Sequence, residues 1–408
     1  EKTYATLAWL DSLAIGHRKD ERLLNSVVSK SSTIILVGAG HAHLHVVAQA
    51  EALIERGARV MLIDPGVFWY SGLATGMLGG MYGAAEDQVD PRALAEAHGV
   101  EFIQDRVAAL ETGVRRLRLA GGGDLTYDYV SLTVGSQVNA AIIEGAANDP
   151  SVWPVKPISN LWKLREYLES RFRAGQTPRV AVIGGGPTGS EVAANLTALA
   201  SRHGNGMSVT LITSSAGLIP QAPSGTARAL QRKLTRLEVD IRLGTRIIRR
   251  EGAALIAADG SRFMADVVVL ANGLEANPLV EKIGLPTRTG IGLRINRRLH
   301  SIADDRVFAS GDCTAMEDFN LPKLGVFGVR QAAYIHANLV ASLEGKPLAD
   351  YTPQKHYLAI LNLGDGTALA MWGPFWWIGR SSMWLKDWID RRFLDYYRQS
   401  FGNNPPQP

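Results

Sequence analysis

Short runs of aliphatic and β-branched residues alternate along the chain with longer segments of helical periodicity. Four of these runs, at positions 34–37, 60–63, 180–183 and 209–212, are apolar except for one threonine, as expected of parallel strands buried on both faces. The first and third runs are each followed by a glycine-rich turn and a helical pattern, which is the order of a dinucleotide-binding unit. The pattern predicts an α/β protein with two Rossmann-like dinucleotide-binding domains.

The first glycine turn contains Gly38 and Gly40, with His43 where a third glycine is usual. Two glycines permit a tight turn and a close approach of backbone N–H groups to a pyrophosphate, which the following helix N-terminus also favours. The next strand ends in Asp64, where a carboxylate accepts hydrogen bonds from a ribose. We expect Gly38, Gly40, His41 and Asp64 to contact an adenine dinucleotide.

The second turn contains all three glycines, Gly184, Gly186 and Gly189. The strand that follows it ends in Thr213, so no carboxylate stands at the ribose position. An acid there usually selects NAD, whereas hydroxyls tolerate a 2′-phosphate. This unit binds NADPH, binds either nucleotide weakly or has lost nucleotide binding. We expect a working NAD(P)H site, without assigning the nucleotide.

A third element indicates FAD in the first unit. A short apolar run at 307–309 leads to Gly311 and Asp312, whose carboxylate can accept hydrogen bonds from ribityl hydroxyls. A helical pattern follows to about residue 343, and its N-terminus would stabilise negative charge on reduced flavin. Lys323, just before this helix, would add positive charge. Taken alone, Gly311 and Asp312 would indicate only a turn.

Composition narrows the classes of partner. The net charge of +4 over 408 residues is too small to indicate nucleic-acid binding, and no basic cluster with interleaved aromatic residues occurs. No apolar run reaches transmembrane length, and no secretory signal opens the sequence. We expect a cytoplasmic protein that can also lie peripherally on the inner face of the cytoplasmic membrane.

The sequence contains one cysteine, Cys313. Flavoproteins that reduce disulfides or oxidise sulfide need a cysteine pair, so this chemistry is excluded, and a free thiol suggests a reducing compartment. His41 and His45 would share a helix face, but no acidic residue or cysteine is near them in the sequence, and no metal site is predicted. We expect these histidines to pack against cofactor and sheet, with His41 close to the dinucleotide. The alternative is that one of them is a proton donor near the flavin, since an imidazole titrates near neutrality.

The C-terminal region is rich in aromatic residues. Five of the nine tryptophans fall between residues 372 and 388. In the helical segment 382–401, apolar residues recur at four-residue spacing, with Lys386 and Arg391 at the margins. This segment suits peripheral contact with a bilayer, packing on the FAD domain, or a homodimer interface. Its balanced acidic residues argue against strong attraction to anionic lipid.

Several longer stretches carry a resemblance to a known family. They are residues 38–43, 70–72, 127–136, 311–313, 321–331 and 384–393. On these stretches the chain resembles type II NADH dehydrogenase-like flavoproteins of the pyridine nucleotide-disulfide oxidoreductase superfamily. It is most similar to the FAD domain found fused to selenophosphate synthetase and to that domain's stand-alone relatives. The resemblance spans about residues 31–398.

The resemblance implies a glutathione-reductase-like arrangement with a small α+β C-terminal domain. The implied parts are an N-terminal extension (1–30), a split FAD domain (31–145 and 285–345), an NAD(P) domain (146–284) and a C-terminal domain (346–408). It implies that Gly135 lies at a crossing between domains and contacts the cofactor. It also implies that Glu191 lies near nicotinamide and flavin, where a buried carboxylate gates nucleotide orientation or relays a proton. The alternative is that Glu191 stands in the first helical turn and only stabilises the helix dipole.

In the family reaction, hydride passes from nicotinamide to flavin, and the flavin then reduces a second acceptor. Type II enzymes commonly form the quinone site with two glutamines, but Val326 and Arg330 occupy those positions here and leave only Gln331 nearby. We expect an FAD-dependent NAD(P)H oxidoreductase with a quinone-like acceptor and catalytic roles for Glu191, Lys323 and Gln331. The alternatives are a soluble FAD oxidoreductase of sulfur or selenium metabolism, and a flavoprotein subunit or scaffold without nicotinamide turnover.

Overall fold

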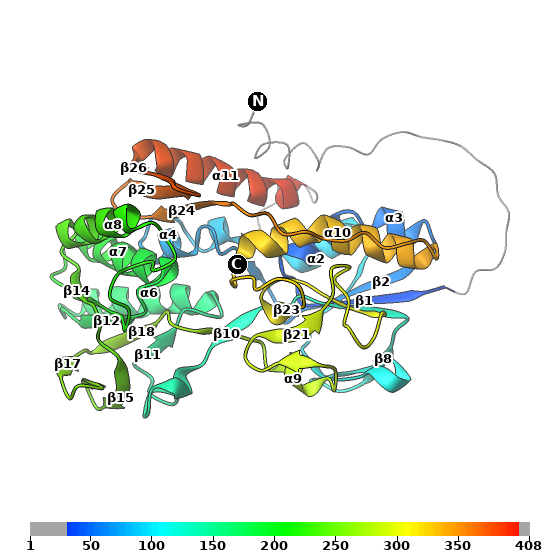
Figure 1. The fold of residues 1–408 in the computed structure, drawn as a ribbon, viewed down its shortest axis with the longest axis horizontal. Helices are drawn as coiled ribbons and strands as arrows, with labels where there is room; N and C mark the ends of the chain where they lie inside the picture. The colour runs from blue at the N-terminus through cyan, green and yellow to red at the C-terminus, as the bar shows by residue number, and fades with distance from the viewer. Residues whose placement is uncertain (1–30, 400–408) are drawn as a thin grey trace. The chain divides into compact units, whose positions relative to one another are not determined.

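A computed structural model describes residues 31–399. The first glycine turn lies at the end of a central strand of the first sheet (Figure 1). The sheet has five parallel strands in the order β22 (Val307–Ala309), β9 (Tyr129–Leu132), β1 (Thr33–Val37), β2 (Arg59–Ile63) and β5 (Glu101–Ile103). The helices packed around it are α2 (His41–Ala48), α3 (Glu51–Ile54), α5 (Pro91–Ala97) and α10 (Gly325–Leu343). Ile34, Ile35 and Leu36 are fully buried, as their unbroken apolar run predicts. The predicted extension, residues 1–30, lies outside the described residues.

The second glycine turn lies at the end of a central strand in another parallel sheet. The strand order is β11 (Val152–Pro154), β18 (Val267–Leu270), β12 (Arg179–Ile183), β13 (Ser208–Ile212) and β14 (Asp240–Arg242). Its helices are α6 (Ser159–Arg173), α7 (Pro187–Arg202) and α8 (Ser224–Arg236). Two parallel sheets joined by crossover helices confirm the predicted α/β class.

Smaller elements connect and extend the two sheets. They are β3 (Phe68–Trp69) with β4 (Gln88–Val89); β6 (Val107–Glu111), β7 (Arg116–Leu119) and β8 (Asp124–Thr126); β15 (Ile247–Glu251), β16 (Ala254–Ala257) and β17 (Arg262–Met264); β20 (Thr287–Arg288), β21 (Gly292–Ile295) and β23 (Thr314–Met316); and the helices α4 (Ala74–Leu78) and α9 (Leu279–Lys282). Antiparallel β10 (Ser136–Val138) and β19 (Leu274–Ala276) pair where the chain passes between the large sheets. Gly135 directly precedes β10, at this crossing.

The C-terminal part is an antiparallel sheet covered by one helix. Its elements are β24 (Leu358–Asn362), β25 (Ala368–Trp372), β26 (Phe375–Gly379) and α11 (Arg380–Arg398). The sheet also contacts α7, where the Asn195 side-chain amide donates to the Asn362 carbonyl over 3.0 Å. Of the predicted helix 382–401, residues 400 and 401 lie outside the described residues.

The inward face of α11 differs from the purely apolar stripe that its spacing suggests. Phe393 and Tyr397 are buried, but so are Lys386 and Asp390. The Lys386 ammonium donates to Asp390 over 2.8 Å and to the Gly72 carbonyl over 2.6 Å. Burial lowers the pKa of Lys386, but the nearby carboxylates outweigh it and raise the pKa above its ordinary value. A buried ion pair therefore fixes α11 to the loop that precedes α4.

Replacing Lys386 by methionine should leave the Asp390 carboxylate buried without its cation, which costs about 3–5 kcal/mol. Hydrogen–deuterium exchange of the central α11 amides should show at least a roughly hundredfold loss of protection. The control is Arg391→Met, which removes an exposed ion pair of the same spacing to Asp387 and should cost under ~1 kcal/mol. Equal exchange in the two variants would contradict the anchoring role of Lys386.

Candidate nucleotide and flavin site

The first glycine turn is held against the neighbouring strand by backbone packing. Gly38 has a φ of 86°, and a Cβ at this position would lie 2.9 Å from the Thr133 carbonyl oxygen. The Gly40 N–H donates to the Thr133 hydroxyl over 3.1 Å, and that hydroxyl donates to the Gly38 carbonyl over 2.8 Å. Side chains at the two glycines are thus excluded, which leaves the turn's backbone open to a pyrophosphate.

Asp64 lies beside this turn, as predicted from the strand pattern. Its carboxylate accepts the Ala39 N–H over 2.7 Å and the Gly66 N–H over 2.9 Å, through different oxygens. Burial raises the pKa of Asp64, although these two N–H groups oppose the shift. Each oxygen can accept a second hydrogen bond, so the carboxylate retains the acceptors that a ribose diol needs.

The histidines of α2 have different surroundings. His43 fills the space of the missing third glycine, and its ring nitrogens contact the Gly38 carbonyl at 2.6 Å and the Ser131 hydroxyl at 2.8 Å. His41 packs against Phe68, Tyr70 and Phe393 at ring-centroid distances of 5.2, 5.8 and 5.6 Å.

These two imidazoles and that of His45 are neutral at neutral pH. Burial lowers the pKa of each of the three to about 4. His41 therefore does not titrate near neutrality, which removes the reason for regarding an imidazole here as a proton donor.

The second glycine turn repeats the geometry of the first. The Gly184 N–H donates to the Ile212 carbonyl over 2.9 Å, as the Gly38 N–H does to the Ile63 carbonyl over 2.8 Å. Thr213 follows Ile212 just as Asp64 follows Ile63, and its side chain lies within 2.8 Å of where a Gly185 Cβ would stand. Thr213 is thus the structural counterpart of Asp64, and a hydroxyl occupies the ribose position.

Three helices present N-termini suited to bind anions. Neither α2, α7 nor α10 has a side-chain cap or an acidic residue in its first turn. Gly40 and Gly186 precede the first two directly, and Gly189 allows α7 to approach its own turn, because a Cβ there would lie 1.8 Å from the Gly184 carbonyl. Uncapped N–H groups and the positive ends of helix dipoles fit phosphates and a reduced flavin.

Asp312 lies in a polar cluster that joins the two large sheets. Its carboxylate accepts the Lys156 ammonium over 2.5 Å and the Ser136 hydroxyl over 2.8 Å, and Lys156 also donates to Ser136 over 2.9 Å. Burial raises the pKa of Asp312, but Lys156, Ser136 and Lys323 outweigh it and hold the pKa below its usual value. An ionised acceptor therefore stands where the sequence predicts contact with ribityl hydroxyls. Lys156, in the loop after β11, has no signal in the sequence that would have identified it.

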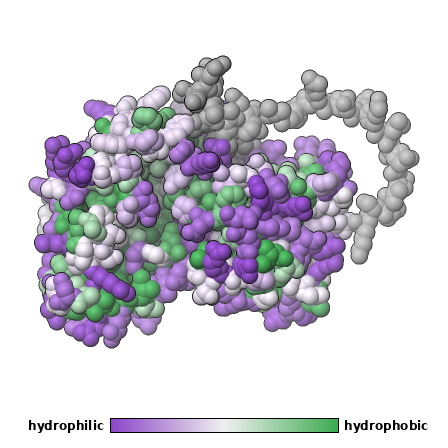
Figure 2. Space-filling model, in the orientation of Figure 1, coloured by the Kyte–Doolittle hydropathy of each residue, from purple (hydrophilic) through white to green (hydrophobic). Residues whose placement is uncertain are grey.

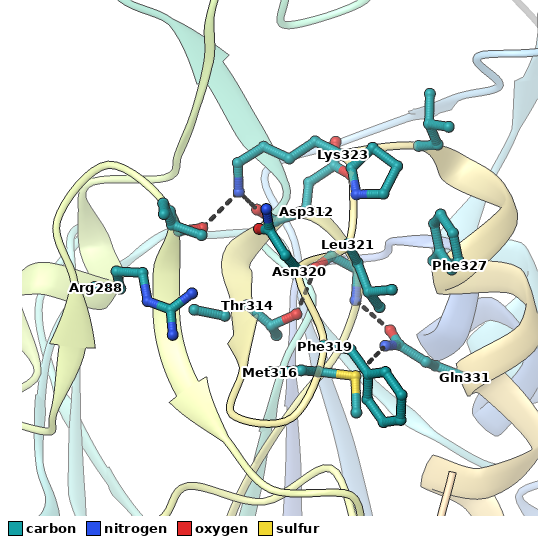
Figure 3. Close-up of a pocket in the computed structure, with 15 residues that line it drawn as sticks. Arg288, Asp312, Thr314, Met316, Phe319, Asn320, Leu321, Lys323, Phe327 and Gln331 are labelled. Carbon is teal, nitrogen blue, oxygen red and sulfur yellow. Dashed lines mark hydrogen bonds between the residues drawn. The ribbon is translucent and has the colours of Figure 1, made fainter. Parts of the chain in front are cut away.

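Lys323 and Gln331 line a pocket beside the Gly311–Asp312 segment, and the polar ends of both side chains bind backbone groups there (Figure 3). The Lys323 ammonium donates to the carbonyls of Ile291 and Asp312. The Gln331 side chain is buried and accepts the Gly311 N–H over 2.7 Å. Both residues thus fix the segment that carries Asp312, and Gly311 has the φ of 71° that this segment requires.

Glu191 lies beyond the first turn of α7, which contains no acidic residue, so the helix-dipole alternative is wrong. Its carboxylate accepts the Asn362 N–H of β24 over 2.8 Å. Burial raises the pKa of Glu191, and Lys386 opposes this shift. The carboxyl group therefore joins the second glycine unit to the C-terminal sheet and to the buried pair under α11.

Comparison with known proteins identifies the family of this chain. Residues 32–334 match the family described as pyridine nucleotide-disulphide oxidoreductase. The chain belongs to this family. It is 25% identical over 366 residues to a type II NADH:quinone oxidoreductase of Haemophilus influenzae, which covers 79% of this chain and 82% of that protein. It is also 25% identical over 308 residues to a demethylphylloquinone reductase of Synechocystis, with 72% and 75% covered.

Solved structures agree on the fold of this pyridine nucleotide-disulphide oxidoreductase. NDH2 from Plasmodium falciparum in complex with NADH superposes with a TM-score of 0.76 at 15% identity, over 92% of this chain and 99% of that chain. A sulfide:quinone oxidoreductase of Aquifex aeolicus gives 0.75 at 16% identity, over 91% and 92%. FAD and NAD(P)H are the cofactors of this family, and both glycine units of the oxidoreductase fit them.

The one cysteine of this family member is not placed for disulfide chemistry. Cys313 is buried, and its thiol contacts the Ser310 carbonyl at 3.3 Å and the Leu132 carbonyl at 3.5 Å. Burial raises the pKa of Cys313 to about 11, so it is a thiol rather than a thiolate at neutral pH.

Thr213→Asp should move nucleotide preference toward NADH by about tenfold. A carboxylate at this position gains charge-assisted hydrogen bonds to the ribose, worth ~1.5 kcal/mol or more, and repels a 2′-phosphate. The measurement is the ratio of second-order rate constants for flavin bleaching by NADH and NADPH. Thr213→Asn, of similar size but uncharged, is the control. An unchanged ratio in the aspartate variant would show that the ribose lies elsewhere.

The buried histidines should destabilise the protein in acid. Because their folded pKa values of about 4 lie below the ordinary 6.5, the unfolded chain binds more protons between these values, and stability falls as pH drops through this window. Each histidine contributes a slope of about 1.4 kcal/mol per pH unit. In urea unfolding across the window, His45→Met should reduce the slope by about this amount. The exposed His356→Met is the control, and an equal slope in both variants would refute the assignment.

Proposed function

We propose that this chain is an FAD-dependent NAD(P)H oxidoreductase that passes electrons from a nicotinamide to a quinone-like acceptor. The observation that carries the proposal is the pair of glycine turns, each at the end of its own parallel sheet and each followed by an uncapped helix. The Haemophilus and Synechocystis relatives, named for quinone and phylloquinone, support the choice of acceptor.

The bound flavin would supply hydride acceptance from the nicotinamide and onward electron transfer. Around it, Asp312 would accept hydrogen bonds through an ionised carboxylate that Lys156 stabilises. Lys323 and Gln331 act by position, since both hold the backbone of the Gly311–Asp312 segment. The uncapped N-terminus of α10 would place positive charge at the cofactor when it is reduced.

Glu191 is the residue we propose for proton handling. Its carboxyl group is held by the Asn362 N–H between α7 and β24, and burial raises its pKa, which favours proton retention. Lys386 and Asp390 lie in the same electrostatic environment and can balance a change of charge on Glu191. Reduction of a quinone consumes protons, so a buried carboxyl group of this kind suits the reaction.

A cluster of aromatic rings lies between the first glycine unit and α11. The rings of Tyr70 and Phe393 stack with centroids 4.5 Å apart at 16°, and His41 packs against both. Tyr70 and Phe393 are buried between the first glycine unit and α11, and each covers a face of the other. The resemblance to type II enzymes places Val326 and Arg330 where those enzymes commonly carry two glutamines, and we propose that the acceptor is bound here without those two amide hydrogen bonds.

The proposed acceptor bears on where the protein acts in the cell. Within residues 31–399, no helix is long and apolar enough to cross a bilayer. We propose a cytoplasmic protein that attaches peripherally to the inner face of the membrane through its C-terminal part, where a lipid-soluble quinone is available. Reduction of a sulfur or selenium compound by a detached form is the second candidate, and the single observation favouring it is the resemblance of residues 384–393 to the selenophosphate synthetase-linked proteins.

Anaerobic mixing of the FAD-loaded protein with NADH or NADPH tests the proposal, because either nucleotide should bleach the flavin absorbance. Glu191→Gln should bleach within a few-fold of the parent rate but reduce a short-chain quinone about a hundredfold more slowly, since general acid–base groups contribute at least this much. Glu238→Gln, an exposed change in the same part of the chain, is the control. No bleaching by either nucleotide would refute the function and favour a structural flavin.

A further inference from the structure

An arginine stripe runs along the outer face of α8. We use this name for Arg228, Arg232 and Arg236, which are exposed and recur at four-residue spacing, so they share one helix face. They line an open groove with Gln231 and Thr235. None of the three forms an ion pair with any residue between 31 and 399. Like charges at this spacing repel one another, and a surface that keeps three of them together suits an anionic partner.

An aromatic patch lies beside the stripe. It consists of Phe375, Trp376, Trp377, Trp384 and Trp388, from β26 and α11. The exposed fractions of Phe375 and Trp384 reach 74% and 68%, which is far from the burial usual for such side chains. The surface over β26 and α11 is pale in Figure 2, since tryptophan has a middle hydropathy. Amphipathic indole rings of this kind favour the boundary between lipid and water.

The stripe and the patch adjoin. A Cβ on Gly225 would lie 3.7 Å from Nε1 of Trp376. Gly225 stands three, seven and eleven residues before the three arginines, and these spacings return to the same side of a helix. The arginine stripe therefore begins beside Trp376, one member of the aromatic patch, and Figure 1 shows α8 next to the C-terminal sheet.

The exposed face of α11 also carries a net positive charge, although acidic and basic residues are about equal in number in the helical segment 382–401. Asp390 is buried with Lys386, and Asp387 accepts the Tyr82 hydroxyl and the Arg391 guanidinium. The exposed Arg392 lies over the Trp388 ring at 5.7 Å. Two of the acidic residues that argued against anionic lipid, Asp387 and Asp390, are thus occupied by protein partners, while Asp395 stays exposed.

We propose that the arginine stripe and the aromatic patch form one surface that binds a bilayer containing anionic phospholipid, with arginines on headgroup phosphates and indoles at the interface. This inference rests on the proposed function, because it explains how the chain reaches a membrane-held acceptor. It adds that the NAD(P)-binding part contacts the lipid directly. An acidic protein partner would use the arginines but leave the aromatic patch in water, so the observations favour lipid.

Sedimentation of the full-length, FAD-loaded protein with vesicles tests this surface. One set of vesicles is phosphatidylcholine, and in the other part of it is replaced by phosphatidylglycerol. The variant Arg228→Gln, Arg232→Gln, Arg236→Gln should bind the anionic vesicles about a hundredfold more weakly, since each arginine near an anionic surface contributes about fivefold. The control changes Arg118, Arg246 and Arg262 to glutamine, which removes the same charge from exposed positions outside α8.

The outcomes separate this inference from the proposed function. Parent-like binding by the stripe variant, or an equal loss in the control, would overturn the inference while flavin bleaching and quinone reduction in solution remain intact. Loss of reduction of an acidic electron-carrier protein, with vesicle binding unchanged, would assign the stripe to a protein partner and also overturn it. Vesicle binding without bleaching by either nucleotide would instead refute the proposed function alone. A further variant, Trp384→Ser, should weaken binding to both kinds of vesicle.

Discussion

Backbone packed directly on backbone, at the carboxyl ends of two parallel sheets, sets the positions of the functional groups. Thr133 presses its carbonyl against Gly38 and Gly40, and the Ala271 carbonyl lies 2.6 Å from where a Gly184 Cβ would stand. A side chain at any of these glycines would push a strand away and tilt the helix that follows. Because the turns stay tight, α2 and α7 point uncapped N–H groups away from their sheets, and the carboxylate of Asp64 can lie beside the first turn.

The two nucleotide units could be predicted because their residues are close together in the sequence. Contacts between residues far apart in the sequence could not be predicted. The strands, the glycine turns and helix 325–343 are as the hydrophobic pattern indicates, since each depends on neighbours in sequence. Lys156 meets Asp312 only after the two sheets pack together, over a separation of 156 residues. Lys323 and Gln331 stand where the motif places them, yet their side chains hold backbone. The sequence pattern also did not show that Lys386 and Asp390 lie on the buried face of α11, although their four-residue spacing is that of an ion pair.

The region under α11 concentrates ionisable groups in a dry environment. Besides Lys386, Asp390 and Glu191, it contains Asp87, whose carboxylate has no hydrogen-bond partner among residues 31–399. Burial, with the nearby Asp390, raises the pKa of Asp87 to about 9, so this group is neutral at neutral pH. Lys386, with Arg398 near Asp87, shares the site with several acids, and they stay compatible because some of the acids keep their protons. A change of charge on any member shifts the protonation of the others, which links α7, through Glu191, to the C-terminal helix.

The split origin of the first sheet affects how the chain reaches its native state during synthesis. Strands β1, β2, β5 and β9 are complete by residue 132, whereas β22, which pairs with the outer side of β9, begins at residue 307. All five strands of the second sheet leave the ribosome in between. Until β22 arrives, β9 is an open edge with unpaired N–H and C=O groups, the kind of edge that promotes association between chains. The inserted unit can fold during this interval, and its delay in closing the first sheet makes the nascent protein a natural client for chaperones.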